Sequence, residues 1–206
     1  MSALTGFPLQ WRERPAPEVV PSGVPQLDLP RGCLTEICGP ASSGRTGLLL
    51  SLMAQATARE EVCALVDASG AFDPHSAAAA GVELARVLWV RCGGDAEKAL
   101  KATDLLVQGG GFGLVAMDLG DIPPRTAGRI SLTSWFRLRR AVEDTPTVLL
   151  AVEREPHAKT CASVVLALRR KRVEWRGRLL RGWEIAVERR KPARSEIGYV
   201  CQHPCR

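Results

Sequence analysis

The stretch GPASSGRT, residues 39–46, decides how the rest of the chain is interpreted. The apolar segment 33–38 precedes it and the apolar segment 48–53 follows it, an order typical of strand, glycine-rich turn and helix. It fits the phosphate-loop pattern G-x-x-x-x-G-K-[ST] at every fixed position but one, because Arg45 stands in place of the lysine. Backbone N–H groups of such a loop, with the positive end of the helix dipole, hold a polyphosphate. The predicted phosphate-binding residues are Gly39, Ser42, Ser43, Gly44, Arg45 and Thr46.

Two further side chains extend this prediction to a metal ion. Thr46 would offer its hydroxyl to Mg²⁺, and Asp118, which ends the apolar run 112–118, would hold the same ion through a water molecule. Arg45 keeps a positive charge near the outer phosphates, but its guanidinium is longer, planar and forked, so it does not replace lysine neutrally. The alternative interpretation is a plain Gly/Ser turn, followed much later by an ordinary aspartate at a strand end.

Short apolar runs alternate with helical patterns and predict a three-layer α/β domain around a mainly parallel sheet. The segment 30–39 is expected to be a turn followed by the first core strand. The other expected core strands are 62–69, 85–92, 112–118 and 147–153, and the expected helices are 46–59, 73–80, 95–108 and 132–143. Residues 119–130 are expected to form a loop. Segments 162–175 and 182–190 read as extended or alternating strands and predict a C-terminal antiparallel hairpin. We expect an arm at 1–21, with a turn and short helix at 22–28, one domain over 22–202, and a tail at 203–206.

The net charge of +6 is concentrated near the end of the chain. Residues 169–194 contain eleven Lys/Arg and three Glu, and the remainder of the chain is slightly acidic. These cations could neutralise DNA phosphates, or they could protect a sheet edge from pairing with another chain. Two tryptophans in this segment, Trp175 and Trp183, are interpreted as core residues rather than as base-stacking platforms. The candidate DNA-binding residues are Arg169, Arg170, Lys171, Arg172, Arg176 and Arg178.

Composition bears on whether the protein contacts a membrane, is secreted or contains disulfides. No apolar run approaches the ~20 residues that span a bilayer, and the first residues lack the pattern of a secretion signal. The seven cysteines are scattered, several of them within apolar runs, and we expect them to be reduced. We therefore predict a cytoplasmic protein without membrane contact.

Four segments, in order, resemble the bacterial RecA recombinase family. The loop 39–46 is similar to GPESSGKT, and residues 67–82 follow DAEHALDPxYAxxLGV without a gap. Residues 114–118 resemble the family's magnesium-site strand, and residues 158–172 resemble its segment NALKFYASVRLDIRR before a hairpin. The resemblance covers roughly 22–202 and implies a RecA-like P-loop fold, ATP with Mg²⁺ as cofactors, and DNA as a partner. It also implies that Asp73 accepts a hydrogen bond from the adenine amino group.

The departures from the family pattern fall on separate steps of its reaction. Arg45 stands at the loop lysine, Ser69 at the catalytic glutamate and Ser76 at the tyrosine that stacks on adenine. The strand that ends at Asp67 is placed to carry a water-activating carboxylate, but no glutamate follows it. The two DNA-binding loop regions are shortened, and we expect the family's N-terminal polymerisation helix and C-terminal domain to be missing. No catalytic residue is therefore assigned.

These departures predict a degenerate RecA-like accessory protein in DNA repair and damage-induced (SOS) translesion synthesis. Its ATP hydrolysis is expected to be absent or weak, with ATP and Mg²⁺ bound weakly or not at all. Residues 82–91 are similar to short ImuA-like relatives, which implies a RecA-like recombinase, a Y-family polymerase homologue and single-stranded DNA as partners. Two alternatives remain: a working DNA-dependent ATPase whose partner supplies the missing carboxylate, and a small strand-exchange recombinase.

Overall fold

The computed structural model describes residues 18–192 and 195–202 of the chain. Within these residues, eight strands form one sheet in the order β10-β9-β8-β3-β7-β6-β4-β5. The strands from β8 to β5 run parallel, and β9 and β10 extend the sheet in antiparallel pairing. Their bounds are β3 (Cys33–Cys38), β4 (Cys63–Asp67), β5 (Val87–Arg91), β6 (Leu114–Asp118), β7 (Val148–Glu153), β8 (Val164–Arg176), β9 (Leu179–Lys191) and β10 (Ser195–Gln202).

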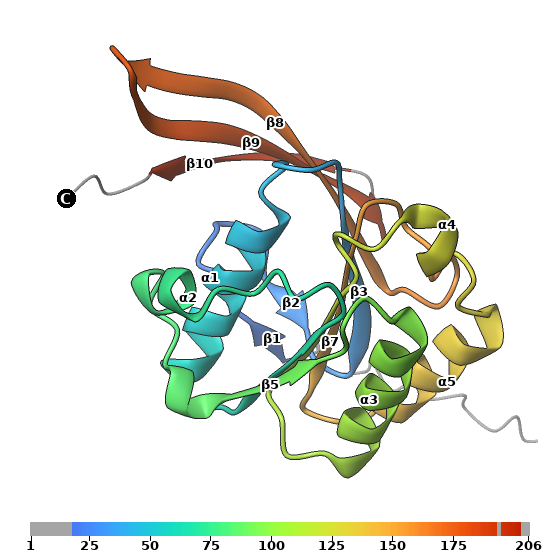
Figure 1. The fold of residues 1–206 in the computed structure, drawn as a ribbon. Coiled ribbons are helices and arrows are strands. Elements are labelled where there is room, and N and C mark those ends of the chain that lie inside the picture. The colour runs from blue at the N-terminus through green and yellow to red at the C-terminus, as the bar shows by residue number, and fades with distance from the viewer. Residues whose placement is uncertain (1–17, 193–194, 203–206) are drawn as a thin grey trace, which may run out of the picture.

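Helices cover both faces of the sheet and complete three layers (Figure 1). Helices α1 (Arg45–Thr57) and α2 (Pro74–Ala79) lie on one face, and α3 (Ala96–Gly109), α4 (Pro124–Ala127) and α5 (Leu132–Val142) on the other. The short 3₁₀-helix η1 (Leu84–Arg86) leads into β5. The predicted α/β architecture with a mainly parallel sheet and a terminal hairpin is confirmed. The loop expected at 119–130 contains the short helix α4, which begins at a proline because proline fits the first helical turn.

The central strands β4, β6 and β7 are apolar up to the carboxylate residue that ends each of them, because both of their faces are covered. Every residue of β4 and β7 is buried. Alternate side chains enter different cores: Leu65 packs towards α1, whereas Ala64 and Val66 pack with residues of α3 and α5. The carboxyl ends of β3, β4, β6 and β7 therefore meet at one edge of a rigid sheet.

The packed part of the chain begins earlier than the expected boundary at residue 22. Strands β1 (Val19–Val20) and β2 (Leu29–Pro30) form an antiparallel ribbon, and Val20 and Leu29 are fully buried. Residues 22–28 form turns between the two strands, and the short helix expected there is wrong. Most of the expected arm and the tail at 203–206 lie outside the described residues.

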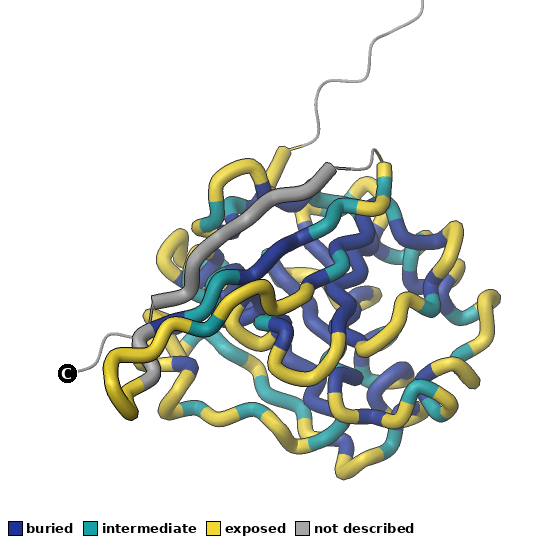
Figure 2. Tube along the Cα trace, turned by 90° about the horizontal axis from the view of Figure 1, so that it is seen from above, coloured by how far each residue is buried: buried dark blue, intermediate teal, exposed yellow. Residues whose placement is uncertain are grey.

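The hairpin of β8 and β9 changes character along its length. Its inner part is buried, with Leu168, Ile185 and Val187 in the core. Its outer part is exposed and projects from the body of the protein (Figures 1 and 2). Trp183 is partly buried against the core, but Trp175 is 62% exposed, so the prediction that Trp175 is a core residue is wrong. The sequence pattern did not predict β10.

Two findings bear on the environment of the chain. No helix in the described part combines the length and the apolar character that a bilayer crossing requires. The described cysteines at positions 33, 38, 63, 92 and 161 are free thiols. Burial raises the pKa of Cys38 to about 11 and that of Cys63 to about 12, so these thiols are unreactive members of the core.

Candidate functional site

The phosphate loop connects β3 to α1 with two glycines in demanding positions. Gly44 adopts a left-handed φ of 95° and precedes α1, whose first turn has no side-chain cap. A Cβ on Gly39 would lie 2.3 Å from the carbonyl oxygen of Leu168, so only glycine lets the loop pass β8 this closely. The uncapped N–H groups of α1 are left available for an anion. The predicted strand, loop and helix are therefore present.

The side chains of the loop divide into exposed and buried groups. Ser42 and Thr46 are exposed, where a ligand reaches them from solvent. Ser43 is 1% exposed, and its Oγ is buried without a hydrogen-bond partner. An orphaned buried hydroxyl beside an uncapped helix is the kind of group that a bound phosphate satisfies. The backbone and the two serines thus fit a polyphosphate.

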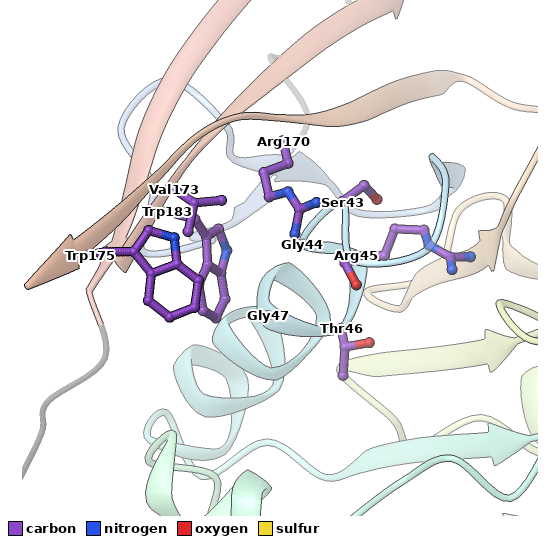
Figure 3. A pocket seen from close by; sticks show the side chains of 10 residues that line it. Ser43, Gly44, Arg45, Thr46, Gly47, Arg170, Val173, Trp175 and Trp183 are labelled. Atoms are coloured by element: carbon purple, nitrogen blue, oxygen red, sulfur yellow. The ribbon is translucent and has the colours of Figure 1, made fainter. Parts of the chain in front are cut away.

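Arg45 turns away from the outer side of the loop and towards the end of β6 (Figure 3). Its side chain is 7% exposed, and its Nη1 donates a hydrogen bond of 3.1 Å to the carbonyl oxygen of Gly120. The Nε of Arg154 donates to the same oxygen at 3.1 Å. Burial lowers the pKa of Arg45, and the charges of Asp118 and Asp121 oppose this shift. The guanidinium is therefore held by the protein itself.

Asp118 stands at the end of β6 beside this guanidinium. Its Oδ1 accepts a 2.8 Å hydrogen bond from the backbone N–H of Gly120. A Cβ on Gly120 would lie 2.8 Å from Arg45 Nη1 and 2.9 Å from Asp118 Oδ1, so the two groups flank one point. Burial raises the pKa of Asp118 to about 6, while the Gly120 hydrogen bond and the Arg45 charge oppose the shift.

This arrangement suits a magnesium ion poorly. A divalent cation between Thr46 and Asp118 would meet the fixed positive charge of Arg45 next to its carboxylate ligand. The loop backbone and its serines therefore fit a polyphosphate, whereas the guanidinium beside Asp118 disfavours a magnesium ion at that carboxylate.

Asp67 ends β4 and is the direct partner of Asp118 in the sheet, but its carboxylate has a structural role. The side chain is fully buried. Its oxygens accept hydrogen bonds from the backbone N–H groups of Gly70, Ala71 and Phe72 at 2.7, 3.1 and 3.1 Å. The indole Nε1 of Trp89 donates a fourth hydrogen bond at 3.2 Å. Because a carboxylate has about four acceptor positions, none remains to orient a water molecule.

Ser69 occupies the position at which the RecA resemblance implies a water-activating glutamate. Its Oγ is buried and has no hydrogen-bond partner. A hydroxyl without an adjacent base cannot deprotonate water at neutral pH. The strand end that the sequence singled out thus carries one saturated carboxylate, Asp67, and one neutral hydroxyl.

Asp73 caps α2, the helix that begins at Pro74. Its carboxylate accepts hydrogen bonds from the backbone N–H groups of His75 and Ser76, at 3.3 and 3.0 Å, and from the Ser76 hydroxyl at 2.5 Å. These bonds lower the pKa of Asp73, the hydroxyl of Ser76 most strongly. An adenine amino group would have to share this carboxylate with the helix cap.

Sequence reasoning missed a buried acidic pair near the same edge of the sheet. Glu36 and Glu153 are both fully buried. Glu36 Oε1 accepts hydrogen bonds from the backbone N–H groups of His157 and Ala158, at 2.7 and 2.6 Å. The ring Nδ1 of His157 lies 2.5 Å from Glu153 Oε2. The glutamate inside the apolar run CLTEIC was the signal that could have revealed this cluster.

The electrostatics of this cluster follow from its burial. Burial raises the pKa of Glu36 to about 7, and the nearby charge of Glu153 adds to the shift. Burial also raises the pKa of Glu153, whereas its hydrogen bond to His157 raises the pKa of that histidine. His157 is therefore held by Glu153, and the cluster anchors the loop that follows β7.

The phosphate loop and the basic hairpin meet at one cavity of about 580 Å³. Residues 42–47 form one wall, and Arg170, Val173, Trp175 and Trp183 form the other (Figure 3). The six candidate DNA-binding residues of the hairpin are all exposed. Only Arg170 among them lines this cavity, and Arg169 lines a second pocket with Gly39 and Pro40 at the start of the loop.

Comparison with known proteins is consistent with this geometry. The family model described as RecA N-terminal domain matches residues 20–126. The chain is 42% identical over 108 residues to Protein RecA of Symbiobacterium thermophilum, covering 49% of this chain and 31% of the relative. It is 32% identical over 161 residues to Protein RecA of Leifsonia xyli subsp. xyli, covering 68% and 45%. The chain thus spans less than half the length of these relatives.

Proposed function

The chain belongs to the RecA family, and on that premise we propose that it is a RecA-like accessory protein of DNA repair with absent or weak ATP hydrolysis. Its phosphate loop retains the backbone that holds a polyphosphate. The groups that position Mg²⁺ and activate water in phosphoryl transfer are occupied or replaced. A bound nucleotide would act as a structural ligand rather than as a substrate for hydrolysis.

One observation carries this proposal: the guanidinium of Arg45 is bound to Gly120 beside Asp118. In a phosphate loop the corresponding cation stabilises charge on the outer phosphates. Here that cation is directed to the place where a magnesium ion and its carboxylate would meet. One substitution therefore weakens both phosphate stabilisation and metal binding.

Water activation is missing for an independent reason. Asp67 has its acceptor positions filled, and Ser69 is neutral. General-base catalysis typically contributes 10²–10⁴-fold to a rate. Even nucleotide bound in the loop would therefore hydrolyse slowly.

The test is ATP turnover by the purified chain with and without single-stranded DNA. The RecA protein of Leifsonia xyli, measured side by side, is the positive control. We expect turnover at least a hundredfold below that control, with no stimulation by DNA. Turnover at the control's rate would refute the proposal.

The cellular role extends the proposal beyond catalysis. A RecA-like protein that does not hydrolyse ATP acts by binding partner proteins and DNA. We assign this chain to damage-induced translesion synthesis, as for ImuA-like proteins. The partners proposed are a RecA-like recombinase, a Y-family polymerase homologue and single-stranded DNA, met in the cytoplasm. Co-sedimentation with each purified protein, with serum albumin as the control, tests this; failure with both proteins counts against the role.

The alternative, a working DNA-dependent ATPase, has one observation in its favour. The loop backbone is intact, with Gly44 left-handed and α1 uncapped, so a partner could complete the site with a carboxylate. A rise in turnover of more than tenfold when the polymerase homologue or the recombinase is added would support this alternative. Unchanged turnover would leave the accessory role as the better account.

A further inference from the structure

The cavity between the phosphate loop and the hairpin combines aromatic and cationic groups. Trp175 and Trp183 form its aromatic end, and Arg170 lies between the indoles and residues Ser43 and Gly44 of the loop (Figure 3). Its volume of about 580 Å³ falls within the range of small-ligand sites. The buried Ser43 Oγ without a hydrogen-bond partner belongs to the same wall. The cavity therefore offers both a stacking surface and polar groups in need of a partner.

A bulge in β8 creates this arrangement. Arg170 pairs with Ile185 and Arg172 pairs with Glu184, so Lys171 is an extra residue in the ladder. Side chains alternate between the faces of a strand, and the extra residue shifts that alternation by one position. Arg170 and Val173 consequently share one face, which continues the face of the buried inner strand. Without the bulge, Arg172 would take the place of Val173.

The same bulge sets the position of Trp175. Trp175 is two residues beyond Val173 and therefore points to the same face. Val173 is the direct partner of Trp183 on β9, so the two indoles lie near each other and towards α1. Bulges are frequent next to binding sites because they re-aim side chains. This bulge directs an indole towards the loop.

The exposure of Trp175 indicates a ligand rather than a packing role. The residue is 62% exposed, although a tryptophan is among the side chains that gain most from burial. Arg170 lines the same cavity, and the exposed cations Arg172, Arg176 and Arg178 follow along the same hairpin. An exposed aromatic among cations is the combination by which proteins bind single-stranded nucleic acid, with bases stacked and phosphates neutralised.

We propose that this cavity binds one nucleotide of single-stranded DNA, with the base stacked on Trp175 and Trp183 and its phosphate on Arg170. The inference rests on the proposed function only in taking DNA as a partner. The chemistry recognised is a nucleobase with its phosphate, which a free nucleotide also carries. The strand is favoured because the exposed cations continue beyond the cavity along the hairpin.

The experiment measures fluorescence anisotropy of a labelled fifteen-residue oligothymidylate against the full chain. Trp175→Ala should weaken binding on the order of tenfold, since stacking of a base on an aromatic side chain has about this effect. Trp175→Phe should restore most of the affinity. Leu179→Ala is the matched control, because Leu179 is 63% exposed on the same hairpin but does not line the cavity. Far-ultraviolet circular dichroism verifies that each variant is folded.

Two further arms separate the contributions of base and phosphate. An oligomer with abasic sugars should bind more weakly and should not distinguish Trp175→Ala from the unaltered chain. Arg170→Ala should reduce the slope of log affinity against log salt by about one, and Trp175→Ala should leave this slope unchanged. Equal losses with the normal and the abasic oligomer would overturn the assignment of Trp175 to base stacking.

The outcomes also separate this inference from the proposed function. If the unaltered chain binds the oligomer and Trp175→Ala matches Leu179→Ala, the cavity site is refuted while DNA binding stands. If the unaltered chain does not bind the oligomer, both the cavity site and the DNA contact of the proposed function are refuted. If Trp175→Ala weakens only a fluorescent ATP analogue, the assignment to a DNA strand is overturned.

Discussion

The charged side chains at the carboxyl edge of the parallel sheet are bound within the chain, whereas those on the outer hairpin are exposed to solvent. At the sheet edge, Arg45, Asp67 and Asp118 are bound to other parts of the same chain. On the outer hairpin, Arg172 and Arg176 are exposed. The edge where a RecA-like fold does its chemistry is thus closed by internal contacts, whereas the hairpin is open to a partner.

The strongest way to break this comparison is to alter the two paired aspartates at the sheet edge. Asp67→Asn should lower the free energy of unfolding by about 3 kcal/mol, because an amide group would face the donors that the carboxylate now accepts from. Asp118→Asn should leave stability at pH 7 unchanged or raised, because it removes a desolvated charge and keeps an acceptor for Gly120. Denaturation in urea measures both.

The two substitutions are matched, since each replaces a strand-end carboxylate by the same amide. Similar losses in both variants would show that Asp118, like Asp67, is a structural group. A large loss for Asp118→Asn alone would reverse the roles assigned to the two strand ends.

The buried acidic cluster provides the second test, through pH. The pKa of Glu36 is raised from 4.5 to about 7, so between these values the folded chain binds more protons than the unfolded chain. Stability is therefore greatest at the acidic end of this window and falls as pH rises towards 7. The raised pKa of His157 acts in the same direction. We expect a decline on the order of 2 kcal/mol between pH 5 and pH 7.5.

Glu36→Gln should flatten a large part of this decline, because the amide does not titrate, and the raised pKa values of Asp118 and Glu153 account for the remainder. Glu97→Gln is the control, since Glu97 is an exposed helix residue paired with Lys101. Urea denaturation at several pH values measures the slope for each chain. A slope that Glu36→Gln leaves unchanged would show that another group dominates the proton balance.

Arg45 gives a third test, with a smaller expected effect. Arg45→Lys places a compact ammonium in the loop and removes the guanidinium next to Asp118. The affinity for Mg²⁺–ATP should increase on the order of tenfold, about 1.4 kcal/mol, and should become dependent on Mg²⁺. Hydrolysis should stay slow because Ser69 is unchanged. Titration of a fluorescent ATP analogue, with and without a chelator, measures this.

Arg154→Lys is the control, because Arg154 donates to the same carbonyl oxygen but lies outside the loop. If Arg45→Lys weakens nucleotide binding, Arg45 itself is a phosphate ligand, and the sheet edge is less closed than we infer. If the two substitutions change nucleotide affinity equally, the cause is the lost hydrogen bond to the Gly120 carbonyl oxygen and not the position of Arg45 in the loop.

Much of the fold could be predicted from the sequence because local patterns specify it. The runs that form β4, β6 and β7 are apolar up to their last residue, as is typical of strands buried on both faces. Asp73 and Pro74 marked the start of α2 for a local reason, namely the cap. Contacts between distant segments could not be predicted from local patterns. Nothing near Arg45 in the sequence indicates that its guanidinium donates a hydrogen bond to the carbonyl oxygen of Gly120.

The hairpin shows the same limit more clearly. Alternation predicted a strand at 182–190, and the structure places Trp183, Ile185 and Val187 on its core side. It could not predict the bulge at Lys171, because an extra residue in a ladder is defined by the register of two strands. Trp175 was therefore placed in the core, although the shifted register and the length of the hairpin leave it exposed.

The smallest expected change in stability is in the outer hairpin. It tests whether the exposed hairpin differs from the internally bonded sheet edge. Substituting Arg172 and Arg176 together by alanine should change the free energy of unfolding by less than about 0.5 kcal/mol, because both side chains are exposed. The same double variant should reduce the salt dependence of oligonucleotide binding by about two charges. If these arginines instead only protect a sheet edge, the salt dependence would stay constant and light scattering would reveal association of the double variant. A large loss of stability would contradict both accounts, since it would mean that the hairpin, like the sheet edge, is closed by contacts within the chain.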